Sequence, residues 1–359
     1  MAAPAESALQ GGFRRFQAEP PTVSGESHPL ETRSHGRDDD VQTFLVTGGS
    51  GFIGSHLVEQ LVRRGDRVRV LDNFANSSPD NLAPWRDDVE VVEGDLRDLA
   101  TVQRVSRGID VVLHQGALGS VPRSIDDPIA SNAANAIGTL HVLVAARDAG
   151  VQRVVCASSS STYGPVETLP QHEDMPLRPM SPYAVSKLGG EMYTQVFSQV
   201  YGLSTIVLKY FNVFGPRQNP NAAYAAVIPL FIQALLRGEA PTIFGDGRQQ
   251  RDFTYVQNVV DANLLAAASS TRGEVCNIAC GQSFSLLDLI AELNGLLGTA
   301  ITPNFAPGRA GDLPRSQASI DKARRLIGFS PGVDFREGLK RTVAWHRDVV
   351  GGPQGRLAP

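Results

Sequence analysis

The 359 residues of this chain are 42% hydrophobic and 19% charged, the balance of an ordinary soluble globular protein with one or two domains. The formal net charge of -4 provides no basic field for nucleic acid, and no apolar run approaches the ~20 residues that cross a bilayer. The three cysteines, Cys156, Cys276 and Cys280, are too few and wrongly spaced for a disulfide framework or a zinc site. We therefore expect no bound metal, no nucleic-acid or membrane partner, and the cytoplasm as the compartment.

Residues 1–40 are predicted to be a disordered tail. They are rich in Ala, Pro, Ser, Gly and charged residues, they show no hydrophobic periodicity, and they lack the apolar core of a signal peptide. A misassigned translation start is the alternative that the sequence leaves open.

The ordered chain is expected to begin with a dinucleotide-binding unit. Residues 43–47 are typical of a buried strand, 55–64 of a helix and 67–71 of a second strand, with a glycine-rich turn after the first strand. Such glycines let backbone N–H groups and the helix N-terminus approach a pyrophosphate. Asp72 follows the second strand, where its carboxylate accepts from ribose hydroxyls and disfavours a 2′-phosphate, so NAD is favoured over NADP. The expected cofactor contacts in this unit are Gly48, Gly51, Phe52, Ile53, Gly54, Asp72 and Asn73.

Strand and helix patterns then alternate, which predicts a parallel, doubly wound sheet with right-handed crossovers. Strands are expected at 89–92, 110–114 and 151–157, and a long helix at 128–149. Asp95 follows the first of these strands and is placed to meet the adenine amine, while His114 is interpreted as a packing residue. The further cofactor contacts expected after these strands are Asp95, Leu96, Gln115 and Ala117.

Beyond a strand predicted at 204–209, the pattern changes to shorter elements with more Pro and Gly. The predicted fold class is therefore α/β, a doubly wound parallel Rossmann sheet with a smaller C-terminal substrate lobe. The expected NAD-binding domain covers 41–212, with 252–280 returning to it. The lobe is expected to comprise 213–251 and 281–350.

A hydroxyl-rich strand end and a Tyr-x-x-x-Lys helix form the candidate catalytic set. Residues 158–162 end a predicted strand, and Ser181 with Pro182 is a typical helix start. Tyr183 and Lys187 are four residues apart and so share one helix face. A tyrosine titrates near pH 10, and bringing its pKa to about 7 takes roughly 4 kcal/mol, which a nearby ammonium and an oxidised nicotinamide would supply. Alone, this spacing is more often an ordinary amphipathic helix face, and the upstream cofactor motif is what favours a proton-transfer site.

With the glycine turn, the serine block and Tyr-x-x-x-Lys in this order, the chain resembles the extended short-chain dehydrogenase/reductase family, and within it the nucleotide-sugar 4-epimerases. The resemblance spans about residues 42–346. The segments that look like the subgroup acting on UDP-N-acetylhexosamines are 116–124, 210–215, 221–229 and 251–253. It implies that Ser159 is the catalytic hydroxyl, Tyr183 the base and Lys187 its partner, which also bonds the nicotinamide ribose. Tyr210 is expected beside the cofactor. The implied substrate contacts are Ser120, Arg123, Ser160, Asn212, Ala226, Val227, Arg251, Arg309 and Ser316.

Two positions discriminate within this family, the site just before the tyrosine of the strand-end block and a gate position. Dehydratases carry Asp-Glu, and decarboxylases a Glu, just before the tyrosine of the strand-end block, where this chain has Ser160 and Ser161. It therefore lacks the carboxylate needed to eliminate water or assist decarboxylation. Ser316 matches a gate position where a bulky tyrosine would exclude an N-acetyl group, and a serine leaves room for it. Gln115 departs from the apolar-Ala pair of many relatives, which alters packing near the nicotinamide.

The resemblance implies reversible C4 epimerisation of UDP-N-acetylglucosamine and UDP-N-acetylgalactosamine, with NAD as cofactor and a lobe that binds the nucleotide sugar. The alternatives are a UDP-glucose/UDP-galactose or UDP-uronic acid 4-epimerase and, from a different class, a non-catalytic NAD-sensing regulator. Relatives dimerise through a four-helix bundle, so a homodimer is expected through the helices at 128–149 and 181–201.

Overall fold

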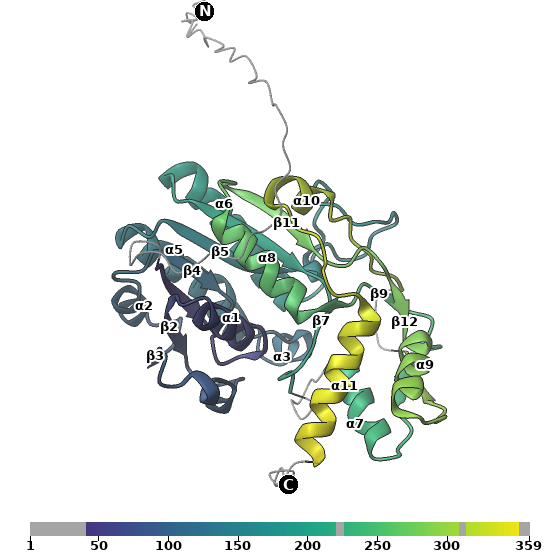
Figure 1. Ribbon diagram of the computed structural model, residues 1–359. Coiled ribbons are helices and arrows are strands. Elements are labelled where there is room, and N and C mark those ends of the chain that lie inside the picture. The colour runs from purple at the N-terminus through teal and green to yellow at the C-terminus, as the bar shows by residue number, and fades with distance from the viewer. Residues whose placement is uncertain (1–40, 220–225, 309–313, 352–359) are drawn as a thin grey trace, which may run out of the picture. The chain divides into compact units, whose positions relative to one another are not determined.

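Seven parallel strands form the central sheet of the computed structural model, which describes residues 41–219, 226–308 and 314–351 (Figure 1). The strand order is β11-β6-β5-β4-β1-β2-β3, so the direction of winding reverses between β1 and β4. This order confirms the predicted doubly wound Rossmann sheet. Its strands are β1 (Thr43–Thr47), β2 (Arg67–Asp72), β3 (Val89–Glu93), β4 (Val111–His114), β5 (Arg153–Ser159), β6 (Thr205–Tyr210) and β11 (Glu274–Ile278). The predicted tail at 1–40 lies outside the described residues.

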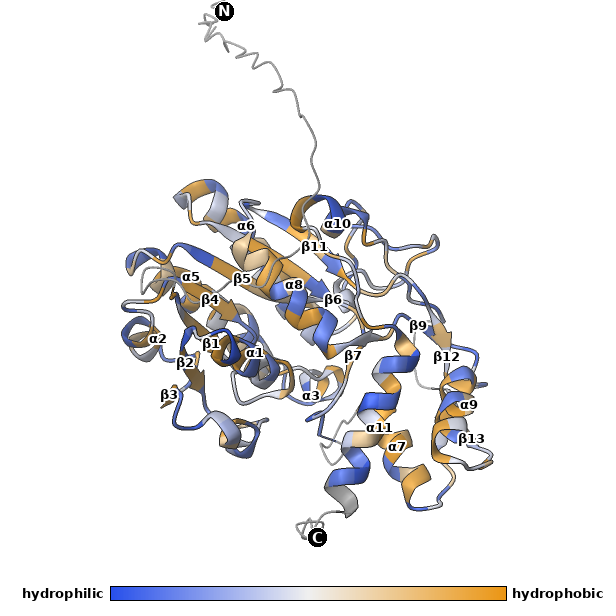
Figure 2. Cartoon of the chain, viewed as in Figure 1, coloured by the Kyte–Doolittle hydropathy of each residue, from blue (hydrophilic) through white to orange (hydrophobic). Residues whose placement is uncertain are grey.

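Helices cover both faces of this sheet, because consecutive residues of each buried strand point to opposite sides. Val46 belongs to the core beneath one helical layer, and its neighbour Leu45 to the core beneath the other. The strands accordingly appear mainly orange in Figure 2. The helices of the first layer are α1 (Phe52–Arg63), α8 (Val256–Ala268) and α10 (Asp321–Ile327). Those of the second layer are α2 (Leu99–Val105), α5 (Gly138–Asp148) and α6 (Pro182–Tyr201).

Local signals explain where the helices of the cleft begin. Helix α6 starts as predicted, with the Ser181 hydroxyl accepting from the Ala184 N–H and a proline in the first turn. Helix α1 begins at Phe52, three residues earlier than expected, because Gly51 serves as its N-cap and the glycine turn leads directly into the helix.

The predicted helix at 128–149 is interrupted by a π-helical segment. It consists of α4 (Pro128–Asn132), the π-helical η3 (Ala133–Ile137) and α5. By length and composition the 21-residue helix is apolar enough to span a membrane, but half of its most apolar window is buried, as in a core helix. The short elements around this helix and the strands are η2 (Pro79–Trp85), α3 (Val121–Asp126) and η4 (Ser160–Thr162).

The lobe is built around α7 (Val227–Leu236), α9 (Leu286–Leu297) and α11 (Phe335–Gly351), which Figure 1 shows together beyond the sheet edge. Its core combines aliphatic and aromatic side chains, and the ring of Phe335 lies 4.2 Å from that of Phe284 and 5.4 Å from that of Phe253. Three two-stranded sheets lie in the lobe or at its border with the rest of the fold. They pair β7 (Val213–Phe214) with β10 (Thr254–Tyr255), β8 (Thr242–Phe244) with β13 (Asn304–Ala306), and β9 (Gln250–Arg251) with β12 (Phe284–Ser285).

The chain returns from the lobe to the sheet twice. The first return supplies α8 and β11, which lie within the expected range 252–280. The second return lies inside the range expected for the lobe, because Ala318, Ala323 and Phe329 are buried in the core beneath α1 and α8. Helix α10 is only seven residues long. Its apolar periodicity is therefore too short to predict which core it packs against.

Candidate active site

The carboxyl ends of the sheet strands open into a cleft of about 1140 Å3, the place where doubly wound sheets bind ligands. The predicted cofactor residues that line it are Gly48, Gly51, Phe52, Ile53, Gly54, Asp72, Asn73, Asp95, Leu96, Gln115, Ala117, Tyr183, Lys187 and Tyr210. The predicted catalytic and substrate residues that line it are Ser120, Arg123, Ser159, Ser160, Tyr183, Lys187, Asn212, Arg251 and Ser316. The cleft therefore brings together residues from nine separate segments of the chain.

Three further predicted substrate residues lie elsewhere. Ala226 and Val227 line a second pocket of about 300 Å3 in the lobe, and Arg309 lies outside the described residues. The pocket adjoins the cleft, because Asn212 and Arg251 line both.

The glycine turn between β1 and α1 leaves no space for side chains. Gly48 has a φ of +68°, and a Cβ built on it would lie 2.7 Å from the Cα of Gly116. A Cβ on Gly54 would lie 2.1 Å from the Gly48 carbonyl oxygen, so only glycine lets the helix pack this closely against the turn. The turn thus exposes backbone N–H groups at the start of a helix, which fits a pyrophosphate.

Asp72 is buried at the end of β2 and holds the surrounding loop in place. Its Oδ2 accepts from the Ser50 N–H at 3.0 Å, and its Oδ1 accepts from the Phe74 N–H and the Ser77 hydroxyl, both at 2.9 Å. A carboxylate has about four lone-pair sites, so these three donors leave capacity for a ribose hydroxyl in the cleft.

Asp95, the predicted adenine contact, forms a bidentate pair with Arg97 at 2.9 and 2.7 Å. It also accepts from the Asn73 side-chain amide at 2.8 Å. The hydrogen bonds from Arg97 hold the pKa of Asp95 far below its usual range, so the carboxylate stays ionised in a pair with Arg97 that is net neutral.

The predicted catalytic groups meet at the end of β5. Ser159 is close enough to the Tyr183 phenol to lower its pKa, and the Lys187 ammonium donates to the Ala157 carbonyl oxygen at 2.8 Å. The Ser159 hydroxyl also accepts from the hydroxyl of Ser161 at 3.0 Å. The structure therefore brings a phenol, an ammonium and a hydroxyl together on the cleft wall.

The surroundings of these groups act on their pKa values in opposite directions. Burial raises the pKa of Tyr183, and the neighbouring Ser159 lowers it. Burial lowers the pKa of Lys187 to about 8. The ammonium is directed at Ala157, and Ser159 is the neighbour that favours the phenolate, so the part of Lys187 in lowering the tyrosine pKa stays a prediction.

Gln115 takes part in a polar network beside the cleft. Its side-chain N–H donates to Asn263 at 3.0 Å and to the Tyr210 hydroxyl at 3.1 Å, and Asn263 donates to the same hydroxyl at 2.8 Å. This explains how a glutamine replaces an apolar residue here. Sequence reasoning missed Asn263, and the available signal was an amide within the apolar pattern of α8.

Asn135 is a second residue that sequence reasoning missed. It is buried in the π-helical segment η3, where its Oδ1 accepts from the Leu118 N–H at 2.7 Å and its Nδ2 donates to the Ser186 hydroxyl at 2.9 Å. It therefore ties a loop of the cleft to the helix that carries Tyr183. π-Helical segments often occur at functional sites, and this one is not visible in the sequence.

The carboxylates among the described residues that line the cleft are Asp72, Asp95 and Asp127. Asp127 caps α4 by accepting from the Ala130 N–H at 2.9 Å. The described segment between β5 and α6, which borders Tyr183, contributes no carboxylate to the cleft. Within the described ranges, no group of three or more His, Cys, Asp or Glu residues is arranged to hold a metal ion.

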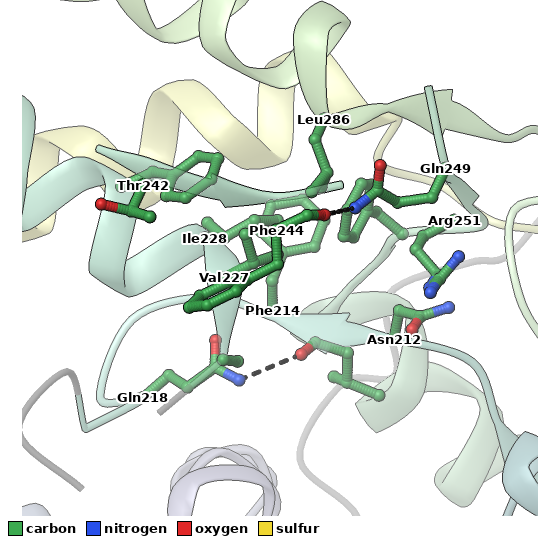
Figure 3. A pocket seen from close by; sticks show the side chains of 14 residues that line it. Asn212, Phe214, Gln218, Val227, Ile228, Thr242, Phe244, Gln249, Arg251 and Leu286 are labelled. Carbon is green, nitrogen blue, oxygen red and sulfur yellow. Dashed lines mark hydrogen bonds between the residues drawn. The ribbon is translucent and has the colours of Figure 1, made fainter. Parts of the chain in front are cut away.

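The lobe pocket is mainly apolar and has polar groups along one edge. Its walls include Phe214 and Phe244, and Figure 3 shows Asn212 and Arg251 next to each other at its edge. The Gln218 side-chain N–H donates to the Val213 carbonyl at 3.2 Å, which fixes a further amide at the pocket (Figure 3). Such a site suits a flat ring that joins a charged group.

Comparison with known proteins agrees with this geometry. Residues 44–279 match the model of the NAD dependent epimerase/dehydratase family. The chain belongs to this family. The match covers the glycine turn, the strand-end serines and Tyr183. The cofactor of the family is NAD, and the cleft fits this dinucleotide through its glycine turn and Asp72.

Members of the family that resemble the chain differ in their named substrates and reactions. A UDP-glucose 4-epimerase of Mycolicibacterium smegmatis is 39% identical over 85% of this chain and 98% of its own. The structure of a UDP-N-acetylglucosamine 4-epimerase from Methanobrevibacter ruminantium, in complex with UDP-N-acetylmuramic acid, has a TM-score of 0.82 and 39% identity, covering 85% of this chain and 98% of that one. A dTDP-glucose 4,6-dehydratase from Streptomyces venezuelae, solved with NAD bound, has a TM-score of 0.81 and 34% identity, covering 86% and 98%. Family membership therefore leaves the reaction and the sugar to be argued from the site.

Proposed function

We propose that the chain is a nucleotide-sugar 4-epimerase that interconverts UDP-N-acetylglucosamine and UDP-N-acetylgalactosamine. The observation that carries this proposal is the meeting of Ser159, Tyr183 and Lys187 at the end of β5, where the described residues of the cleft place no carboxylate beside them. These groups serve one operation, the reversible removal of a proton from a sugar hydroxyl.

Each residue has a defined part in this reaction. Tyr183 takes the proton of the C4 hydroxyl, and Ser159 bonds the phenol and the sugar oxygen. Lys187 contributes positive charge that favours the phenolate, and it holds the nicotinamide ribose. NAD held in the cleft would supply reversible hydride chemistry at C4, so there would be no net oxidation. The 4-keto sugar turns over between the two transfers, anchored only by its diphosphate, which Arg251 and Asn212 hold at the edge of the lobe pocket.

The absence of an acid beside Tyr183 distinguishes epimerisation from the other reactions of the family. Elimination of water needs a second proton donor or acceptor, and the positions before Tyr163 are Ser160 and Ser161. Both serines line the cleft, and a hydroxyl is too weak an acid for that role at neutral pH.

Ser316 favours an N-acetylated sugar. It is buried in the cleft wall, and its small side chain donates to the Gln171 carbonyl oxygen Oε1 at 3.5 Å. The serine leaves space for an acetamido group, whereas a bulky residue at this position would fill that space. UDP-glucose with UDP-galactose, and the UDP-uronic acids, are the alternative substrates, because a roomy site also admits smaller substituents.

The lobe is suited to bind the remaining part of the substrate, the nucleoside diphosphate. Val227 and Ala226 lie in its apolar pocket, which continues into the cleft at Arg251 and Asn212. We place the uracil ring in this pocket and the diphosphate at its polar edge.

A second copy of the chain is the proposed protein partner. Apolar side chains are exposed on neighbouring helices α4 and α6, and Ile129 is 81% exposed. Val185, Met192, Val196 and Val200 continue this surface along α6 at helical spacing. Pairing of two such surfaces would bury them in a four-helix bundle in the cytoplasm.

Incubating the purified protein with UDP-N-acetylglucosamine tests the proposal. We expect UDP-N-acetylgalactosamine to form until both sugars coexist at equilibrium, without added reductant. UDP-glucose and UDP-glucuronate are assayed separately, and faster turnover of either would replace the proposed substrate. Retention of NAD with no turnover of any of these sugars would favour the regulator instead.

A further inference from the structure

Three consecutive residues at the end of β5 lie beside three residues of α6 that are spaced four apart. Ala157 is hydrogen-bonded to Lys187 and Ser158 to Glu191, and Ser159 is close enough to Tyr183 to lower its pKa. Residues four apart lie on one face of a helix, so this face of α6 is hydrogen-bonded to the strand end at two successive turns. Two of the three helix residues line the cleft, and Glu191 does not.

Glu191 is a buried carboxylate with two partners. Its Oε2 accepts from the Ser158 hydroxyl at 2.7 Å, and its Oε1 lies 3.2 Å from the Lys209 ammonium. The side chains of Glu191 and Lys209 are only 4% and 1% exposed. Lys209 in turn lies over the ring of Tyr163, 4.2 Å from its centroid. A buried ion pair is costly to build and contributes little to stability by itself, so its retention beside a reacting helix points to a role in geometry.

We propose that Glu191 is a positioning residue that holds α6 against β5 and so keeps the Tyr183 hydroxyl beside Ser159. This inference rests on the proposed function of Tyr183. The contacts of Tyr183 and Lys187 involve groups whose protons or partners change during the reaction. Glu191 does not line the cleft, its bond with Ser158 takes no part in the reaction, and Lys209 keeps the carboxylate in one orientation.

Losing this bond should act on the chemical step. A shift of about 1 Å in a catalytic group can cost roughly 100-fold in rate, whereas substrate binding by the lobe stays intact. The neighbouring Ser159 lowers the pKa of Tyr183, so weakening this contact raises that pKa. We therefore expect the pH profile of activity to move to higher pH when the Ser158–Glu191 bond is lost.

Ser158→Ala removes the bond without leaving a buried charge unpaired, since Glu191 keeps Lys209. We expect kcat to fall about 10- to 100-fold with KM changed less than about threefold, and the pH profile to shift upward. Ser106→Ala is the matched control, because the Ser106 hydroxyl is also buried and donates one 2.8 Å bond, to Val102, away from the cleft. A Ser158→Ala enzyme that behaves like Ser106→Ala in kcat and pH profile overturns the proposal.

If single substitutions disturb folding, two double variants test the positioning role of Glu191 instead. Glu191→Gln/Lys209→Met keeps an acceptor for Ser158 with no buried charge, whereas Glu191→Leu/Lys209→Met removes the acceptor in a matched apolar setting. We expect the first to keep kcat within about threefold of the parent and the second to lose about 10- to 100-fold. Equal kcat in the two double variants contradicts a positioning role.

A measurement independent of turnover is the titration of the phenol. Phenolate absorbance is followed against pH in the NAD-loaded protein, and the curve of Tyr183→Phe is subtracted to isolate Tyr183. The pKa of Tyr183 should be higher in Ser158→Ala than in Ser106→Ala, and an unchanged pKa contradicts the positioning role of Glu191. An active Tyr183→Phe enzyme would refute the proposed function itself, whereas an inactive one with a normal Ser158→Ala enzyme refutes only the role of Glu191.

Discussion

Where β5 meets α6, directional hydrogen bonds hold the helix to the strand end, whereas the lobe is held by an apolar core that contains stacked aromatic rings. Lys187 and Glu191 are each bonded to a residue of one strand end. In the lobe, Phe335 stacks on Phe284 with ring centroids 4.2 Å apart, and polar side chains are a minority of the pocket lining.

This difference corresponds to the two tasks that the cleft combines. Proton and hydride transfer depend on the directions and distances of a few atoms, which hydrogen bonds to a rigid sheet fix. Holding a base depends on buried apolar area, which rings provide without strict direction. Changes at the first end should therefore lower kcat, and changes at the second should alter KM or stability.

The largest effect is expected for Tyr183→Phe, which removes the proton acceptor. Turnover of UDP-N-acetylglucosamine should fall by about 10³- to 10⁴-fold while bound NAD is retained. Kinetics and the NAD content of the purified variant measure both. Tyr193→Phe, on the exposed side of the same helix, is the control and should keep its activity. Normal turnover in Tyr183→Phe would exclude the tyrosine as the base.

Phe335→Ala tests the lobe end, because it opens a cavity in the aromatic core. The free energy of unfolding should fall by about 3–5 kcal/mol, while the kcat of the protein that remains folded changes little. Denaturant unfolding and active-site titration measure the two quantities. Phe305→Ala is the comparison, since Phe305 is 57% exposed and should cost far less. A selective loss of kcat in Phe335→Ala would break the proposed division of tasks.

Ser316→Tyr tests the sugar gate. Filling the space beside this buried serine should reduce kcat/KM for UDP-N-acetylgalactosamine by about 100-fold or more, with a smaller loss for UDP-galactose. Parallel assays of the two sugars give the ratio. A uniform loss for both would show that the new side chain merely disturbs the cleft.

Arg251→Ala removes a proposed diphosphate contact. We expect KM to rise about 10- to 100-fold, because hydrogen bonds to charged groups are worth about 1.5–3 kcal/mol, with a smaller change in kcat. Steady-state kinetics separate the two parameters. Arg248→Ala, three residues earlier and exposed, should resemble the parent. An unchanged KM in Arg251→Ala would place the diphosphate elsewhere.

The smallest effect is a pH dependence. Burial lowers the pKa of Lys187 to about 8, so its ammonium is present below that pH and is lost above it. We expect kcat to decline as pH rises through about 8, and this decline to be missing from the residual activity of Lys187→Met. A parent kcat that rises steadily up to pH 10 would contradict the need for a charged Lys187.

Much of the molecule followed from local patterns. The alternating apolar runs predicted the parallel sheet, and Ser181 with Pro182 predicted the start of α6. The motif residues of the cleft could be named because glycines and a Tyr-x-x-x-Lys spacing are tied to backbone geometry at short range. Their chemical roles remain predictions.

Other features arise only from contacts between distant segments. Gln115 and Asn263 meet across 148 positions, and Ser158 and Glu191 across 33, so no spacing in the chain could pair them. The burial of Ala323 likewise depends on contacts with distant segments, because it shares a core with residues of α1 and α8.

By itself, the sequence determined the sheet, the dinucleotide turn and the presence of a tyrosine and a lysine on one helix face, because each depends on the periodicity or conformational limits of neighbouring residues. Only the tertiary structure decided which groups surround that tyrosine, and hence the directions in which its pKa is shifted. The reason is physical: burial and hydrogen bonding depend on the distance between side chains in space, and folding brings together residues that the chain keeps far apart.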